Sequence, residues 1–356
     1  TAAMRTCVGD PQRTLPGVIL AWTRDFCERF EALKGYDLRP WLLALLRDVG
    51  PETDQIRCDY YDALTTWYIE AYHGNLSAWA AGNGLDYIGH TLEDPLWGAV
   101  RSQGNQIRVL ESFHRPGLDY LGHGVGTREN PFRILASKCG SSVAHIQGKP
   151  RVMCESFGGS GHGHTLAARR LDANFMACLG VNMFIPHAFY YSFQGFRKTD
   201  WPPTEFYHSP FWPWYRHWAD YLARLSVLES AGRHVSDALV LQPIRTVQVD
   251  MFQNGETVRE PEAQKLFNRV SDLLLRLHHD YDFADESQLL RAQVQDGRLA
   301  FAESEETYPL LVLPGCRVIS LETARFLKRL FDGGGHNAAS VPRGRSNARP
   351  CDVKNG

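Results

Sequence analysis

Helical stretches alternate with short apolar runs along most of this chain. Residues 58–81 carry an apolar stripe at helical spacing, and Gly82 to Gly84 end it, because glycine readily adopts the backbone conformation that follows a helix. The same pattern predicts helices at 22–33, 40–46, 130–147 and 165–179, and strands at 85–90, 117–123, 151–159 and 180–192. Strands that alternate with helices imply parallel βαβ units. We therefore predict an α/β fold that begins with a (β/α) barrel, partial or complete.

A second, smaller unit is predicted after the Trp-rich region and the helix at 213–231. The run 308–314 is apolar throughout, as in a buried parallel strand. Further strands at 237–243 and 281–285 and helices at 262–279 and 321–331 complete the pattern. This order predicts a flavodoxin-like, doubly wound α/β domain. We expect a barrel domain over 1–231, the second domain over 232–335 and a disordered tail over 336–356, which is rich in Gly, Pro, Arg and Asn.

The predicted barrel is short of strands. About four strands are predicted before residue 200, whereas a closed barrel of this kind has about eight. An incomplete barrel leaves exposed sheet edges and an uncovered apolar surface, which proteins rarely tolerate. We therefore expect a homo-oligomer in which another subunit covers the open half. The alternative is that residues 1–60 contain strands without a recognisable pattern.

Composition narrows the classes of function. A net charge of −2 without a long basic run argues against a nucleic-acid partner, and no stretch is long and apolar enough to span a membrane. The eight cysteines form no CxxC pair, which favours reduced thiols and a cytoplasmic protein, with a signal peptide lost upstream as the alternative. Aromatic residues reach 12% and cluster at 201–221, as in sugar-binding clefts or in an aromatic-rich core.

Carboxylates near the ends of predicted strands are the candidate catalytic groups, because parallel barrels carry their chemistry at the C-terminal ends of strands. Glu155 follows an apolar run and would be costly to bury without a role. The structural alternative is an ion pair with Arg151 or Arg169. Glycoside hydrolysis uses two carboxyl groups, one as acid and one as nucleophile or base. We predict Glu155 and Glu93 as this pair, and Glu111 is a weaker candidate.

Other polar and aromatic side chains lie near the same strand ends. We predict that five of them contact the sugar: His90, Asp119, His187, Tyr190 and Trp201. The histidines also permit a metal-dependent hydrolase as an alternative, since His162 and His164 form the HxH pattern found in zinc enzymes. That pattern lies in a glycine-rich loop rather than on a strand, so no metal ligands are assigned. The loop also lacks the lysine of a phosphate-binding loop and the GxSxG of a serine esterase.

Several segments together resemble glycoside hydrolase family 106, the α-L-rhamnosidase type, and more loosely the large barrel β-galactosidases. They are WTRDFCERFEALKGYDLRPWL (22–42), DYYDALTTWYIEAY (59–72), HRPGLDYL (114–121), KPRVMCESFGG (149–159) and GVNMFIPHAFYYS (180–192). The resemblance covers roughly residues 20–335. It implies a glycosidase barrel followed by a glutamine-amidotransferase-like domain, a carbohydrate substrate and a catalytic carboxylate at Glu155. It also implies calcium as an associated ion, although no calcium loop is visible.

The chain departs from the family pattern at its beginning. The family carries a carboxylate in an Asp-Glu-Pro turn shortly before the first of these segments, where this chain has Asp10-Pro11. The leading hypothesis is a glycosidase that cleaves a terminal sugar, such as an α-L-rhamnoside or a β-galactoside. The alternative is a truncated relative that binds carbohydrate without cleaving it.

Overall fold

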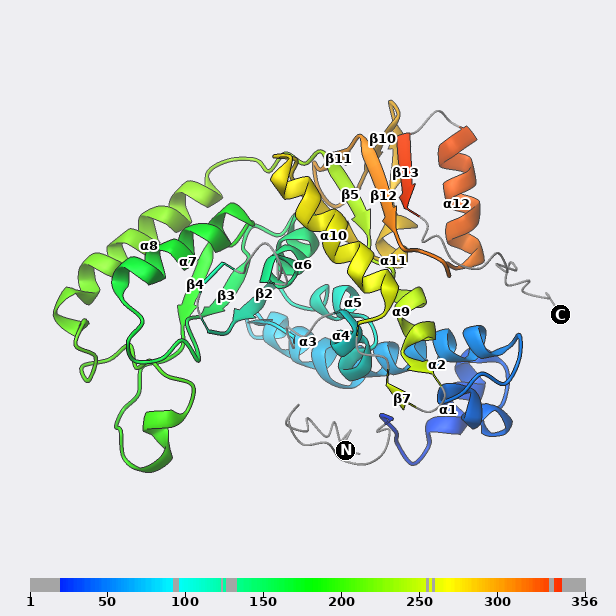
Figure 1. The fold of residues 1–356 in the computed structure, drawn as a ribbon, viewed down its shortest axis with the longest axis horizontal. Helices are drawn as coiled ribbons and strands as arrows, with labels where there is room; N and C mark the ends of the chain where they lie inside the picture. Colours follow the sequence, from blue (N-terminus) through cyan, green and yellow to red (C-terminus); the bar gives the residue numbers. More distant parts are fainter. Residues whose placement is uncertain are drawn as a thin grey trace.

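The computed structural model describes residues 20–91, 96–122, 124–125, 133–253, 256–257, 260–332 and 336–340. The chain forms two α/β units, each built on a parallel sheet (Figure 1). Among the described residues, no helix has both the length and the apolar character to cross a bilayer.

Helices dominate the described chain up to residue 110, and one two-residue strand at 88–89 interrupts them. The helices are α1 (Phe26–Lys34), η1 (Arg39–Leu45), α2 (Thr53–Tyr68), η2 (Ile69–His73), α3 (Gly74–Gly82), α4 (Leu96–Gln103) and α5 (Gln106–Leu110). The helix predicted at 58–81 is α2, η2 and α3 in succession, with one π-helical turn between the two α-helical parts. The predicted helix at 40–46 is a 3₁₀ helix.

The first sheet is a curled parallel half-barrel whose strands lie in chain order. They are β1 (Ile88–Gly89), β2 (Arg115–Tyr120), β3 (Met153–Ser156) and β4 (Met183–Pro186). The helices α6 (Arg133–Ile146), α7 (Leu166–Cys178) and α8 (Tyr215–Ser230) follow β2, β3 and β4 in turn, and α7 and α8 lie side by side on one face of the sheet (Figure 1). The half-barrel is therefore the partial form of the predicted barrel.

The observed strands are shorter than the sequence suggests. Predicted strand 180–192 keeps regular pairing only over Met183–Pro186, and predicted strand 85–90 only over Ile88–Gly89. Proline has no N–H to donate to a ladder, so Pro186 is a natural end for β4. The apolar residues beyond it belong to a loop that contains η3 (Gly195–Thr199) and η4 (Trp212–Trp214).

The second unit has a parallel sheet with the order β13-β12-β5-β8. Its strands are β5 (Ala238–Leu241), β8 (Tyr281–Ala284), β12 (Leu310–Pro314) and β13 (His336–Ser340). The helices around it are α9 (Ile244–Asp250), α10 (Glu262–Arg276), α11 (Glu286–Leu289) and α12 (Leu321–Asp332). The short strands β6 (Phe252–Gln253), β7 (Glu256–Thr257), β9 (Gln293–Gln295), β10 (Arg298–Ala300) and β11 (Thr307–Tyr308) form antiparallel ladders.

The disordered tail is predicted to start at residue 336, but the first five residues of that range form a strand. Residues 336–340 form β13, which pairs in parallel with β12 from Leu310↔His336 to Pro314↔Ser340. The small residues of this segment carry no apolar pattern, but the backbone N–H and C=O groups of β12 supply a ladder that any residue with a free N–H can join. The rest of the predicted tail lies outside the described residues.

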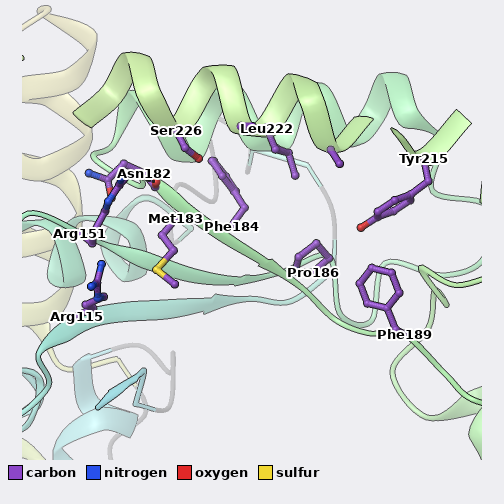
Figure 2. Close-up of a pocket in the computed structure, with 12 residues that line it drawn as sticks. Arg115, Arg151, Asn182, Met183, Phe184, Pro186, Phe189, Tyr215, Leu222 and Ser226 are labelled. Carbon is purple, nitrogen blue, oxygen red and sulfur yellow. Dashed lines mark hydrogen bonds between the residues drawn. The ribbon is translucent and has the colours of Figure 1, made fainter. Parts of the chain in front are cut away.

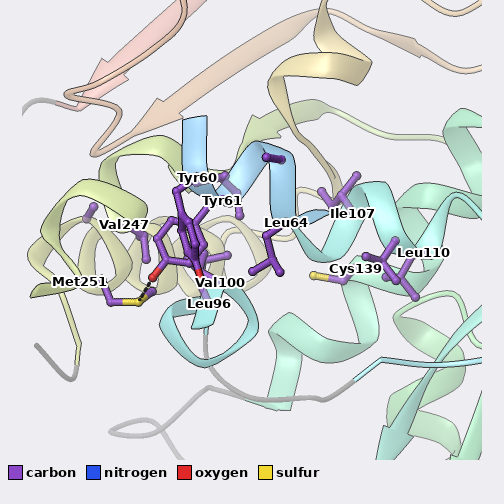
Figure 3. Close-up of a cluster of buried hydrophobic side chains, with 14 of the residues drawn as sticks. Tyr60, Tyr61, Leu64, Leu96, Val100, Ile107, Leu110, Cys139, Val247 and Met251 are labelled. Atoms are coloured by element: carbon purple, nitrogen blue, oxygen red, sulfur yellow. Dashed lines mark hydrogen bonds between the residues drawn. The ribbon is translucent and has the colours of Figure 1, made fainter. Parts of the chain in front are cut away.

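One core connects the two units. Tyr61 and Leu64 of α2 pack with Val247 of α9 and Met251 just after it, and the Tyr61 hydroxyl lies 2.9 Å from the Met251 sulfur (Figure 3). The same cluster extends to Val240 of β5. Helices of the first unit therefore pack against residues of the second sheet.

Candidate active site

Glu155 lies on the concave face of the half-barrel. Side chains alternate along a strand, and Cys154 packs outward with Met176 and Leu118 under the helices. Glu155 therefore points inward, with 32% of its side chain exposed. Its register partner on β2 is Asp119, so two carboxylates on neighbouring strands share the inner face.

Two histidines flank the Glu155 carboxylate. His90, directly after β1, places Nε2 2.8 Å from Oε2, and His187, directly after β4, places Nε2 3.9 Å from Oε1. Thus side chains from the first, third and fourth strands of the half-barrel converge at its C-terminal edge. The strand-end rule identified these three residues from the sequence.

Both ring nitrogens of His90 lie within hydrogen-bond distance of an oxygen atom. Its Nδ1 lies 2.8 Å from the backbone oxygen of Thr91, which can only accept, so Nδ1 carries a proton. A hydrogen bond from Nε2 to ionised Glu155 then requires a second proton and makes the ring an imidazolium. The His90 hydrogen bond lowers the pKa of Glu155 from its usual value, and partial burial acts in the opposite direction. Electrostatic attraction to the His90 and His187 rings lowers this pKa further. Glu155 is thereby suited to act as nucleophile or base rather than as acid.

The loop after β3 fits tightly between aromatic rings. A Cβ on Gly158 would lie 3.3 Å from the His187 ring, and a Cβ on Gly159 would lie 3.0 Å from the Trp201 ring. Gly159 also has φ +73°, a conformation that favours glycine. These two glycines let the backbone beside Glu155 approach both rings.

The remaining predicted sugar contacts differ in exposure. Trp201 is 55% exposed, and its ring lies beside Gly159. Tyr190 is only 8% exposed, and its hydroxyl donates to the backbone oxygen of Asp200. Tyr190 therefore holds the loop that carries Trp201.

A buried ion pair supports the same loops, and no sequence pattern predicted it. Arg169 of α7 donates to the Glu205 carboxylate, and both side chains are almost completely buried. Burial raises the pKa of Glu205 to about 7, while the Arg169 guanidinium acts in the opposite direction. Arg169 also donates from Nε to the His164 backbone oxygen at 3.1 Å. Glu205 comes from an irregular segment after two prolines, where no periodicity marks a buried residue.

Other sequence candidates occupy different places. Glu93 lies outside the described residues. Glu111 pairs with Arg291 of the second unit, away from the half-barrel edge. The alternative in which Glu155 pairs with Arg151 or Arg169 is not what the structure shows, because Arg169 pairs with Glu205 and Arg151 donates to Asn182 and Ser230.

The HxH histidines do not join His90 and His187. His164 lies 3.0 Å from Asp172 in a buried contact, and His162 lies 3.0 Å from the Lys198 backbone oxygen on the surface. Within the described part of the chain, the group of side chains with metal-ligand spacing is elsewhere, at the junction of the two units.

A cavity of about 500 Å³ lies between the edge strand β4 and helix α8 (Figure 2). Its lining includes Arg115, Arg151, Met183, Phe184, Tyr215 and Leu222. Its lining contains none of the predicted site residues that the structure describes. The cavity marks the open side of the half-barrel and is distinct from the Glu155 cluster.

Comparisons with known proteins agree with this architecture. A rhamnosidase from Novosphingobium sp. PP1Y superimposes with a TM-score of 0.64 at 20% identity over 90% of this chain and 31% of its own. A beta-galactosidase from Bacillus circulans sp. alkalophilus gives a TM-score of 0.61 at 11% identity over 90% of this chain and 49% of its own. Both likenesses are at the level of the fold.

A curated relative and a family model extend the comparison to sequence. A protein from Formosa agariphila named "Putative beta-glucuronidase" is 23% identical over 335 residues, which are 90% of this chain and 26% of that protein. The chain thus spans about a quarter of that relative's length. The family model for alpha-L-rhamnosidases of glycoside hydrolase family 106 matches residues 17–350. The chain therefore belongs to glycoside hydrolase family 106.

Proposed function

We propose that this chain carries the nucleophile or base of a glycosidase that removes a terminal sugar from a glycoside. The observation that carries the proposal is the 2.8 Å contact between the His90 imidazole and the Glu155 carboxylate at the C-terminal edge of the half-barrel. An ionised carboxylate in a partly open position suits attack on an anomeric carbon or on a water. Membership of a rhamnosidase family makes an α-L-rhamnoside the first substrate to test and a β-galactoside the second.

The proposed reaction needs a proton donor besides Glu155. One carboxyl group gives its proton to the leaving oxygen while the other attacks the anomeric carbon or deprotonates water. Because the pKa of Glu155 is lowered, we assign Glu155 to the second role and Glu93 to the first. His90, Asp119 and His187 would contact sugar hydroxyls from the inner face.

The aromatic residues have separate proposed roles. The exposed indole ring of Trp201 would stack on the apolar face of the sugar. Tyr190 would act through its hydrogen bond to Asp200, which fixes the loop that carries Trp201.

Calcium does not fit the described residues of this edge. The ion takes roughly six to eight oxygen ligands. Asp119 and Glu155 are the two inner-face carboxylates of β2 and β3, and Glu155 already faces two histidines.

The open half-barrel supports a proposal on assembly. β4 ends the order of its sheet and borders the cavity beneath α8. We propose that a second copy of the chain covers this edge. A non-catalytic carbohydrate-binding protein is the second candidate function, favoured by the half-barrel with four strands in the described residues.

We also propose that the second unit is flavodoxin-like. Numbered along the chain, its parallel strands have the spatial order 2-1-3-4, which supports this proposal because flavodoxin begins with the same order.

A panel of nitrophenyl glycosides tests the proposed function. Release of nitrophenol from the α-L-rhamnoside or the β-D-galactoside supports a glycosidase. Binding of the free sugar without release from any member of the panel supports the second candidate.

A further inference from the structure

A cluster of imidazole and carboxylate groups lies where the two units meet. His145 is at the end of α6, His234 is in the connection between α8 and β5, and Asp282 is in β8. Asp282 has no exposed side-chain surface. One ligand atom from each residue lies within 4.8 Å of the others. None of these residues belongs to the Glu155 cluster.

The hydrogen bond of His234 to Asp280 determines where its lone pair points. The His234 Nε2 lies 2.9 Å from Asp280 Oδ2, so this nitrogen carries the proton that the carboxylate accepts. In the neutral ring Nδ1 then carries a lone pair. This Nδ1 is buried and makes no hydrogen bond with a described residue. A carboxylate that accepts from the distal nitrogen is the arrangement that orients histidine ligands on zinc.

The buried Nδ1 of His234 faces carboxylate oxygens. It lies 3.5 Å from Asp282 Oδ2 and 3.4 Å from Glu306 Oε2. A lone pair directed at carboxylate oxygens is repulsive unless a proton or a metal ion lies between them. These separations are long for a hydrogen bond but match the distance of about 3.3 Å between ligands that surround a tetrahedral ion at about 2.0–2.1 Å.

His145 completes the group from the other unit. Its Nδ1 lies 3.0 Å from Asp282 Oδ1 and 3.2 Å from Asp282 Oδ2. The Tyr308 hydroxyl donates to Asp282 Oδ2 at 2.8 Å, which orients this carboxylate further. The rings of His145 and His234 stack with centroids 3.8 Å apart, so a shared ion requires them to splay until both lone pairs point at it.

Charge balance favours a dication. Asp280, Asp282 and Glu306 supply three negative charges, and Lys138 supplies one positive charge through contacts to Asp280 at 2.9 Å and Asp282 at 3.7 Å. Although burial lowers it, the contacts with Asp280 and Glu306 raise the pKa of His234 to about 9, so a proton on this ring supplies part of the counter-charge in the metal-free chain. A divalent ion bound in place of that proton would complete the charge balance, and uncompensated buried charge is costly.

We propose that His145, His234 and Asp282 form a site for a divalent transition-metal ion of the zinc type, which ties the half-barrel unit to the second unit. Glu306 or a water would supply the fourth ligand. The ion would act on stability, because its ligands come from α6, the α8–β5 connection and β8 and lie away from Glu155. His145 would move its proton from Nδ1 to Nε2 on binding.

The test uses ZnCl₂ as the probe on the full chain after EDTA treatment and dialysis. Bound zinc is measured by elemental analysis after gel filtration, and thermal unfolding is followed with and without zinc. We expect about one zinc per chain and a higher Tm with zinc. At a free zinc concentration one hundred times Kd, the expected stabilisation corresponds to roughly a hundredfold shift of the unfolding equilibrium.

Two ligand variants and one control assign the zinc. His234→Ala and His145→Gln should each abolish both the bound zinc and its effect on Tm, and the second remains informative where the first fails to fold. His279→Ala is the control, because His279 also pairs with an aspartate, Asp237 at 3.0 Å, but on the surface. Absence of bound zinc in the unmodified chain overturns the proposal. Zinc that is retained by both ligand variants also overturns the proposal. Stabilisation by mild acid with no response to zinc overturns it as well, because protons then supply the counter-charge.

Discussion

His90 donates from Nε2 to Glu155 Oε2 at 2.8 Å, which links the residue after the first strand of the half-barrel to its third strand. The contact brings together residues that are 65 positions apart and holds the carboxylate ionised. An ionised Glu155 suits the proposed role of nucleophile or base.

Glu155→Gln should abolish most of the proposed activity and leave the fold intact. The substitution is isosteric and removes the charge from a position that is 32% exposed. We expect turnover to fall by roughly a hundredfold to ten-thousandfold. Turnover and Tm are measured on the same preparation. Glu262→Gln, on the surface of α10, is the matched control and should change neither. Hydrolysis that persists in Glu155→Gln at the unmodified rate contradicts the assignment.

His90→Ala should raise the pKa of Glu155, because the largest favourable contribution to the ionised form is lost. Carbon NMR of the Glu155 carboxyl group measures this pKa directly, and the acid limb of any pH–rate profile should move to higher pH with it. His217→Ala, at an exposed position on α8, is the control. An unchanged Glu155 titration would show that the contact does not control ionisation.

The contact between His90 and Glu155 also predicts in which direction stability changes with pH. The pKa of Glu155 in the folded chain lies below its ordinary value of 4.5, so the folded state binds the proton less tightly than the unfolded state. The resulting stabilisation is present above the unfolded pKa and is lost as the pH falls through the folded pKa. Chemical unfolding between pH 6 and pH 3, about 1.5 units on either side of the ordinary value, should show a smaller loss of stability in His90→Ala than in the unmodified chain.

Gly159→Ala should displace Trp201. The new Cβ would lie 3.0 Å from the indole and would hold a strained φ of +73°. Gly161→Ala is a matched control, because Gly161 has φ +86° but no atom within 4 Å of the place that its Cβ would take. Both variants should lose about 1 kcal/mol of stability from backbone strain. Only Gly159→Ala should also weaken sugar binding or raise KM, and an equal effect of both variants on binding would exclude a role for the Trp201 position.

Residues on strands could be predicted from the sequence, whereas pairs formed across the fold could not. Glu155 lies near the end of β3, and His90 and His187 directly follow β1 and β4, so the strand-end rule placed them together. Arg169 and Glu205 are 36 positions apart, and the cluster of His145 and Asp282 spans 137 positions. No local spacing marks such contacts, because they depend on how helices and loops pack. β13 was not predicted for a related reason: its place in the sheet rests on the ladder to β12 rather than on its own side chains.

Removing one partner of the Arg169–Glu205 pair should destabilise the chain more than replacing both partners by apolar residues. Both side chains are almost fully buried, so Glu205→Ala leaves a guanidinium without its counter-charge. We expect a loss of about 3–5 kcal/mol. The double variant Arg169→Met/Glu205→Leu removes both charges and should lose less than the single variant. Urea unfolding measures both values, and a double variant that is less stable than Glu205→Ala contradicts this account.

We expect the chain to self-associate through the open edge of the half-barrel, and one charge introduced there should disrupt the association. Ser226 lines the cavity between α8 and β4, and a lysine there would have to be buried by a covering subunit. Sedimentation of the unmodified chain at micromolar concentration should give a mass above the 40.3 kDa of one chain. Ser226→Lys should sediment as a monomer. Glu229→Lys, at an exposed position on the same helix, should keep the assembly. Only a lysine inside the covered cavity loses its hydration when two copies meet. A monomeric unmodified chain, or dissociation of both variants alike, would therefore rule out the β4 edge as the interface.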